Sequence, residues 1–267
     1  MRYVVFIIIS LGLLLSSISG TSVAVAFPSI IGSFKTSLIT AGWVLSIYQI
    51  ALTIMMPIMG KLSDIIGRKT TFLLCLVMFI IGSFLSAIAP SIGFLIGARF
   101  IQAIGGCGFM PSATGIISEE FPDSRQKAIG MFSSIFPIGQ ILGPNLGGWL
   151  IAKFDWRSVF WVNIPLGFIV LILSFFLLRK DGKEGGKIDY KGAIYLAVFL
   201  SSFLAGLSVI GNTINILSIT IASLLIIMSV IFFILFIKEE KSSSNPILDI
   251  EIIKNPPFAA ANTFNFI

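Results

Sequence analysis

Residues 60–70 read Gly-Lys-Leu-Ser-Asp-Ile-Ile-Gly-Arg-Lys-Thr, a short charged stretch that lies between two long apolar runs. The run before it covers Ile39 to Met59, and the run after it covers Thr71 to Ala89. Each run is long enough to cross a bilayer, which takes ~20 helical residues. The stretch therefore predicts a tight reversal of the chain at a membrane surface.

Four residues of this stretch suggest how the reversal is made. Gly60 is predicted to end the first helix, because a residue in the left-handed conformation often follows a helix. Gly67 is predicted to allow a tight turn before the second helix. Asp64 lies four residues before Arg68, so the sequence predicts a local ion pair, or an interaction of Asp64 with the N-terminal end of the next helix.

The composition places the chain among membrane proteins. Of its 267 residues, 56% are hydrophobic and only 11% are charged, whereas a soluble domain carries about 25% charged residues. The apolar runs are continuous and of helical length, unlike the short alternating strands of a membrane barrel. We therefore predict an all-α polytopic membrane protein.

The same composition argues against several other classes of protein. The net charge of +6 comes from basic residues in loops rather than from a basic patch with aromatics, so no nucleic-acid partner is predicted. The chain has no histidine, and Cys75 and Cys107 lie inside apolar runs, where a thiol acts as a small hydrophobe. The sequence thus predicts no metal site, cofactor, disulfide or enzyme.

Eight spans are predicted. The first could instead be a cleavable signal peptide, because Arg2 precedes an apolar run that ends near Ala24-Val25-Ala26. Apolar character continues to Ile31, which favours a retained first helix. The other spans are predicted at residues 39–60, 71–89, 92–116, 128–152, 159–178, 192–211 and 214–237.

Charge in the loops predicts the orientation. If the N-terminus is cytoplasmic, the inside segments hold 14 of the 18 lysines and arginines, and the outside segments hold only Lys35, Lys153 and Arg157. Such a bias is typical of a cytoplasmic N-terminus. The chain is predicted to reside in the cell membrane as a multi-pass protein.

Polar links divide the chain into predicted parts. Residues 1–180 are predicted to form a six-helix bundle and residues 192–237 a further helix pair. Cytoplasmic linkers are predicted at 181–191 and 238–257, and residues 258–267 are predicted to begin a ninth helix that is truncated.

Arg99 is the one ionisable residue well inside a predicted span. Because a charge at bilayer depth is costly, Arg99 should face a cavity or polar partners. Gln102 lies one turn further on and shares its helix face. The alternative is a structural arginine that binds helix backbones.

The predicted fifth span carries a run of small residues. Gly139, Gly143 and Gly147 are spaced by four, so they line one helix face and permit close packing. Pro144 removes a backbone hydrogen bond, and Gly148 follows the seam. A generic packing seam is the alternative to a functional motif.

Together these motifs resemble the Major Facilitator Superfamily. The 60–70 stretch, with Gly60, Leu62, Asp64, Gly67, Arg68 and Lys69, matches the family's helix 2–3 signature. Residues 99–106 resemble its helix-4 motif, and Gly139 to Gly148 match its antiporter motif, G-x-x-x-G-P-x-x-G-G. The opening of the sixth span, with Trp156 and Trp161 placed for an interfacial aromatic belt, is similar to the 14-span drug:proton antiporter branch.

Two departures from that branch stand out. Its first helix often reads D-x-T-I-V-N-V-A-L-P, and counting back from Pro28 places Ser19 at the acidic position and Ala24 at the asparagine. The resemblance also covers only the first six helices, an inserted pair and the start of a ninth helix. A C-terminal half is expected from another chain or a homodimer.

The resemblance implies proton-coupled export of amphipathic small molecules or drugs. Arg99 and Gln102 would line the transport or proton path, the 60–70 stretch would gate the cytoplasmic side, and lipid, substrate and protons would be the partners. The alternative is a non-transporting truncated fragment, or a regulatory or binding membrane protein.

Overall fold

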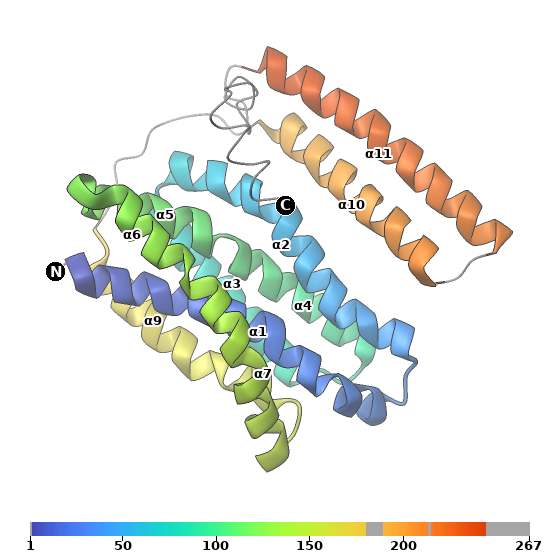
Figure 1. The fold of residues 1–267 in the computed structure, drawn as a ribbon, viewed down its shortest axis with the longest axis horizontal. Coiled ribbons are helices and arrows are strands. Elements are labelled where there is room, and N and C mark those ends of the chain that lie inside the picture. The colour runs from blue at the N-terminus through green and yellow to red at the C-terminus, as the bar shows by residue number, and fades with distance from the viewer. Residues whose placement is uncertain (1, 180–188, 213–214, 244–267) are drawn as a thin grey trace. The chain divides into compact units, whose positions relative to one another are not determined.

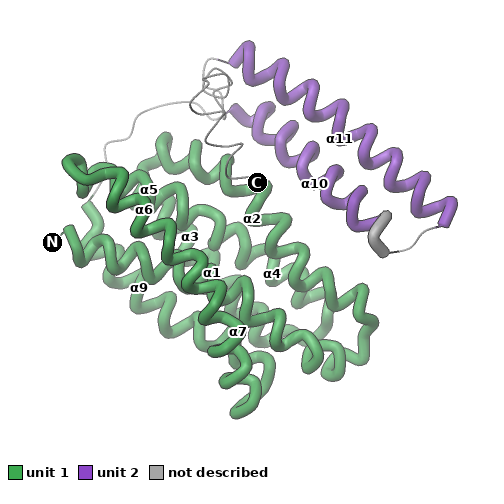
Figure 2. The backbone as a smooth tube through the Cα atoms, viewed as in Figure 1, with its two compact units in different colours: residues 1–185 green, residues 186–267 purple. Residues whose placement is uncertain are grey.

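The computed structural model describes residues 2–179, 189–212 and 215–243, and within these residues every regular element is a helix. The chain divides into two compact units, residues 1–185 and 186–267 (Figure 2). Unit 1 contains α1 (Arg2–Phe34), α2 (Leu38–Ile66), α3 (Arg68–Ala87), α4 (Ile92–Cys107), α5 (Phe109–Glu120), the 3-10 turn η1 (Pro122–Ser124), α6 (Arg125–Ser133), α7 (Ile135–Lys153), α8 (Ser158–Trp161) and α9 (Asn163–Leu177) (Figure 1). Unit 2 contains α10 (Tyr190–Asn212) and α11 (Ile216–Ser242).

Seven stretches of the described residues are long and apolar enough to cross a membrane, namely α1, α2, α3, α4 with α5, α8 with α9, α10 and α11. They correspond to seven of the eight predicted spans. The remaining predicted span, 128–152, falls on α6 and α7. Gln140 and Asn145 make α7 less apolar than the others, yet α7 packs along α1 as part of the same bundle (Figure 1).

Three of the predicted spans are broken helices, and each break lies four residues before a proline. The elements α4, α6 and α8 end at Cys107, Ser133 and Trp161, and the prolines concerned are Pro111, Pro137 and Pro165. Proline has no N–H and its ring clashes with the carbonyl of residue i−4. Each helix therefore stops at the carbonyl that the proline cannot satisfy.

The reversal between α2 and α3 occurs at Gly67 alone, which has φ 101°. The prediction for Gly67 is confirmed, whereas the prediction that Gly60 ends a helix is wrong. α2 continues through Gly60 to Ile66, and the Gly67 N–H caps the Ser63 carbonyl at 3.1 Å. A helix keeps its own backbone hydrogen bonds in water as well as in lipid, so it need not end where the apolar run ends.

Each of the two predicted linkers overlaps a helix at one of its ends. The predicted link at 238–257 starts inside α11, and the predicted link at 181–191 overlaps the start of α10 at Tyr190. There the Asp189 carboxylate accepts the Gly192 N–H at 2.9 Å, which stabilises the first turn of α10. The rest of both linkers and the predicted ninth helix at 258–267 lie outside the described residues.

Glycines set two close helix crossings in unit 1. Between α3 and α4, a Cβ on Gly82 would lie 2.3 Å from the Gln102 backbone nitrogen, and one on Gly105 would lie 2.3 Å from that of Phe79. Between α1 and α7, a Cβ on Gly143 would lie 2.0 Å from the Thr21 hydroxyl oxygen. Both crossings thus depend on the absence of a side chain.

The core of unit 1 consists of two large apolar clusters with a polar layer between them, and a small third cluster of Tyr48, Ala51 and Ala103. One cluster includes Leu13, Phe79 and Phe109, and the other includes Val23, Ala87 and Leu95. Seven buried polar residues of α1, α3 and α4 lie between the residues of the two large clusters, namely Ser16, Ser17, Ser19, Ser22, Ser83, Arg99 and Gln102. The layer therefore lies midway through the bundle.

The α1–α7 crossing yields a prediction. Gly143→Ala should lower the thermal unfolding midpoint, because the added methyl group meets Thr21 and the Ile18 carbonyl, and overpacking of this kind costs ~1–3 kcal/mol. Gly148→Ala is the matched control, because its Cβ would meet only Val25 at an ordinary 3.8 Å. Thermal unfolding of the two purified variants in detergent measures the difference. Equal midpoints would show that the crossing is not close-packed.

Candidate functional site

Arg99 lies at the centre of the polar layer and is fully buried. Its Nη1 donates to the Gln102 Oε1 at 2.6 Å and to the Ser19 hydroxyl at 3.4 Å, and its Nε donates to the Val44 carbonyl at 3.4 Å. The side chain of this α4 residue therefore reaches both α1 and α2. The structure confirms that Arg99 and Gln102 share a helix face and that both have polar partners; their role in transport stays a prediction.

Ser19 on α1 is the acceptor on which this layer converges. Its hydroxyl receives the Gln102 Nε2 at 3.0 Å and the Asn163 Nδ2 at 3.2 Å in addition to Arg99. Gln102 also donates to the Ser83 hydroxyl at 2.7 Å. One neutral oxygen thus serves three donors, from α4 and α9, and joins three helices.

The charge of Arg99 is stabilised by an aromatic ring rather than by an acid. The guanidinium carbon lies 3.9 Å from the centre of the Tyr48 ring, a distance typical of a cation–π interaction. The Tyr48 hydroxyl is held by Ser16 at 2.9 Å. None of the 12 acidic residues of the sequence lies in the interior of a span of unit 1.

One charged donor of the layer has no acceptor within reach among the described residues. Arg99 Nη2 is buried and has no hydrogen-bond partner. A buried donor without a partner costs ~1–3 kcal/mol, and more when the group is charged. The layer therefore favours an additional group that accepts hydrogen bonds, such as a carbonyl or carboxylate oxygen.

The glycines of the predicted helix-5 motif lie on one face, against α1. Gly139, Gly143 and Gly147 are buried, and Cβ atoms on them would meet Ser17, Thr21 and Ser22, whereas a Cβ on Gly148 would meet only Val25 at ordinary distance. Pro144 lies inside α7, which continues through it. The seam joins the helix that carries Ser19 to α7, so it positions the polar layer.

The 60–70 stretch, called the α2–α3 link below, contacts other helices at Arg68 and Lys69, the first two residues of α3. Arg68 forms an ion pair with Glu119 of α5 and donates to the Gly115 carbonyl at 3.0 Å. Lys69 donates to the carbonyls of Phe175 and Leu178, at the C-terminal end of α9, at 2.7 and 2.5 Å. A cation at this end also interacts favourably with the helix dipole.

The predicted pair between Asp64 and Arg68 is absent from the structure. Asp64 is exposed and makes no hydrogen bond or ion pair with any described residue, because the Arg68 side chain turns towards α5 instead. The positive φ of Gly67 changes the direction of the chain between the two residues, so the i, i+4 rule for a continuous helix does not apply to them.

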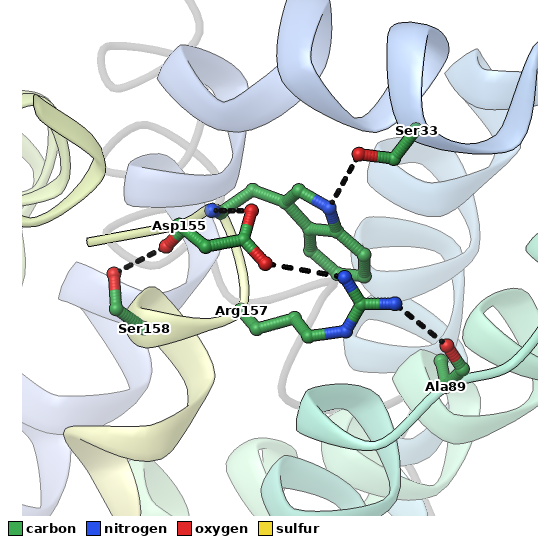
Figure 3. Close-up of polar contacts among 6 residues, drawn as sticks. Ser33, Ala89, Asp155, Arg157 and Ser158 are labelled. Atoms are coloured by element: carbon green, nitrogen blue, oxygen red, sulfur yellow. Dashed lines mark hydrogen bonds and ion pairs between the residues drawn. The ribbon is translucent and has the colours of Figure 1, made fainter.

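At the opposite end of the bundle, the residues at the start of α8 are bonded to α1 and to the link between α3 and α4 (Figure 3). The Trp156 indole donates to the Ser33 hydroxyl at 3.0 Å, and Arg157 donates to the Ala89 carbonyl at 3.3 Å and pairs with Asp155 at 3.1 Å. Trp156 is only 1% exposed, so its prediction as an interfacial belt residue is wrong, whereas Trp161 is exposed. Trp156 is buried because Phe34 and Phe160 pack against its ring.

Sequence reasoning missed the partners of Arg99. Tyr48, Ser83 and Asn163 come from three different helices, and no spacing along the chain connects them. Ser19 carried a usable signal, since it is one of five hydroxyl residues in seven positions of an otherwise apolar helix. A polar cluster in one span indicates a polar surface that other spans must meet.

Comparison with known proteins adds independent information. The Major Facilitator Superfamily matches residues 9–250 of the chain. Multidrug resistance protein 3 of Bacillus subtilis (strain 168) is 39% identical over 265 residues, which cover 96% of this chain and 50% of that protein. The riboflavin transporter RibZ of Clostridioides difficile (strain 630) is 31% identical over 264 residues, which cover 98% of this chain and 56% of that protein.

The fold agrees with these similarities. The crystal structure of the POT family transporter PepTSo superposes with a TM-score of 0.58 at 16% identity, covering 91% of this chain and 55% of that structure. The chain thus spans about half the length of the curated relatives it matches. With residues 9–250 matched, an all-helical fold and a polar residue layer inside a bundle of membrane-spanning helices, the chain belongs to the Major Facilitator Superfamily.

Proposed function

We propose that this chain is the N-terminal portion of a transporter that exports amphipathic small molecules or drugs in exchange for protons. The observation that carries the proposal is the polar layer around Arg99, fully buried midway through an apolar bundle. Buried ionisable groups in membrane spans commonly mark substrate or proton paths. The name of the 39% identical relative, a multidrug resistance protein, supports drugs as the substrate class.

Export requires a second bundle in this proposal. Transporters of this kind alternate access by rocking two bundles around a site near the middle of the bilayer. Unit 1 supplies one bundle, and the second comes from a C-terminal half or a second copy of the chain. The N-terminus is cytoplasmic, as the excess of basic residues in the inside segments supports.

Within the layer, Arg99 and Gln102 line the polar path. Ser19 takes the position that an acid occupies in the drug:proton branch, so the Arg99 charge has no carboxylate beside it. A hydroxyl cannot bind or release a proton near neutral pH as a carboxylate can. Substrates that bring an acceptor oxygen to Arg99 are therefore favoured over purely cationic ones.

The α2–α3 link has two roles in this proposal. Arg68 and Lys69 fasten α3 to α5 and α9 within the bundle. Asp64 is exposed at the same end, so it is available to latch the cytoplasmic face to the second bundle.

A non-transporting fragment is the second candidate. Unit 1 is a compact bundle with its own two apolar clusters, and such a bundle can be stable without a second half. The candidates differ in one measurement. Export that appears when a C-terminal six-helix half is co-expressed supports the transporter, and no export in any combination supports the fragment.

Replacing Arg99 tests the transport path. With the C-terminal half present, Arg99→Ala should abolish the uptake of an amphipathic dye into energised inverted vesicles, which is the direction of export, and Arg99→Lys should retain part of it. Lys153→Ala is the control, because Lys153 stacks on Trp149 at the end of α7, outside the layer. Efflux by Arg99→Ala at the unsubstituted rate, or efflux that survives collapse of the proton gradient, would contradict the proposal.

Ser19 provides a test that needs no transport. Ser19→Ala should destabilise the bundle by ~1–3 kcal/mol, because three buried donors lose their shared acceptor. Ser19→Asp should raise the thermal midpoint, because a carboxylate beside Arg99 satisfies the same donors and balances the charge. Ser19→Asn is the neutral control of matched size. A lower midpoint for the aspartate than for the asparagine variant would show that the layer is not short of negative charge.

The two roles of the α2–α3 link can be separated by stability and efflux. Glu119→Gln removes the partner of Arg68 and should lower the thermal midpoint slightly, by ~1 kcal/mol or less for a pair this exposed. Asp64→Asn should leave the midpoint unchanged and reduce efflux. A reduced midpoint for the Asp64 variant would place Asp64 in the bundle's own packing instead.

A further inference from the structure

A pocket of about 330 Å³ lies between the first turns of α1 and the start of α6. Its walls are formed by Tyr3, Phe6, Phe121, Ala128 and Met131, and its polar groups are Ser124 and Lys127. This volume is at the low end of the range of about 300–1,000 Å³ for small-molecule sites. The pocket lies away from the polar layer, so it is a separate site.

The apolar wall is built by ring contacts between elements that are far apart in sequence. The Phe121 ring meets the Tyr3 ring edge-on with centroids 5.8 Å apart, and it meets the Phe6 ring with centroids 6.1 Å apart. Phe6 also contacts Phe132 of α6 at 6.4 Å. These contacts hold the wall in place, while Tyr3 and Met131 remain exposed at its rim.

Lys127 gives this pocket a positive charge that is not neutralised within the bundle. Lys127 is exposed and makes no hydrogen bond or ion pair with any described residue. The charged residues nearest to the pocket in sequence are Arg2, Glu120, Asp123 and Arg125, so basic groups outnumber acidic ones by three to two when Lys127 is included.

The pocket at the opposite end of the bundle provides a comparison. It is lined by Phe154, Asp155, Arg157 and Trp161 among others, so it also combines aromatics with a cation. There Arg157 is neutralised by Asp155 and donates to the Ala89 carbonyl (Figure 3). Of these two pockets, only the one with Lys127 combines an apolar wall with a cation that has no ion-pair partner among the described residues.

We propose that the pocket between α1 and α6, which the orientation proposed above places on the cytoplasmic side, binds an anionic phospholipid of that leaflet. The phosphate would lie at Lys127 and the Ser124 hydroxyl, and the start of an acyl chain would lie along Phe6 and Met131. The position supports this occupant, because the pocket is at the ends of two spans, where lipid headgroups lie. Basic pockets between helices on the cytoplasmic side bind anionic headgroups.

Native mass spectrometry of the purified chain tests the proposal. The chain is released from nanodiscs that contain equal parts of phosphatidylglycerol and phosphatidylcholine, and the retained lipids are counted. The chain should retain phosphatidylglycerol in preference, and Lys127→Ala should reduce that preference by about fivefold, the effect of one basic residue near a membrane surface. Lys127→Arg should keep it.

Lys153→Ala is the matched control. It removes one lysine from the far end of the same predicted span, which α6 and α7 form together. No preference in the unsubstituted chain, or equal losses in the Lys127 and Lys153 variants, would overturn the proposal. Displacement of the lipid by inorganic phosphate alone would show a phosphate site instead. Retention that vanishes when the C-terminal half is co-expressed would show that the second bundle covers the pocket, and would also overturn the proposal.

Discussion

Burial of one guanidinium group organises the bundle. Arg99 carries a charge in the middle of an apolar assembly, and helices α1, α2, α4 and α9 must therefore each direct a polar atom or a ring to the same place. The cost of an unmatched charge in such surroundings exceeds that of almost any single apolar contact. Four helices are thus fixed in rotation by one residue, and the apolar clusters on either side pack around that arrangement.

The hydrogen-bonding needs of the backbone explain where the membrane-spanning helices are interrupted. A membrane helix must satisfy its own backbone groups, so it stays regular wherever it can. Proline prevents this at Cys107, Ser133 and Trp161, and there the crossings divide into two segments. At Thr53 and Gln140, four residues before Pro57 and Pro144, the helices continue. The same residue type thus interrupts some membrane-spanning stretches and is tolerated in others, including α1, which continues through Pro28.

The sequence predicted the order and approximate positions of the seven membrane-spanning stretches seen in the described residues, because long apolar runs leave few alternatives in lipid. It also placed Arg99, Gln102 and the α7 glycines correctly within their helices. It could not supply Tyr48, Ser83 or Asn163 as partners of the layer, because those contacts depend on the rotation of separate helices. The predicted ion pair between Asp64 and Arg68 was wrong for a related reason. The positive φ of Gly67 changes the direction of the chain, and the Arg68 side chain pairs with Glu119 instead.

The crossing of α1 and α7 has a mechanical consequence. Serine and threonine atoms of one helix lie directly against the bare backbone of the other, and Ser17 donates to the Phe136 carbonyl at 2.6 Å across the crossing. The Ser17, Thr21 and Ser22 side chains of α1 fill the space left by the glycines of α7, so the two helices are in close contact there. A molecule that passes sideways between lipid and the interior of the protein must therefore enter elsewhere, because α1 and α7 form a closed wall along these residues.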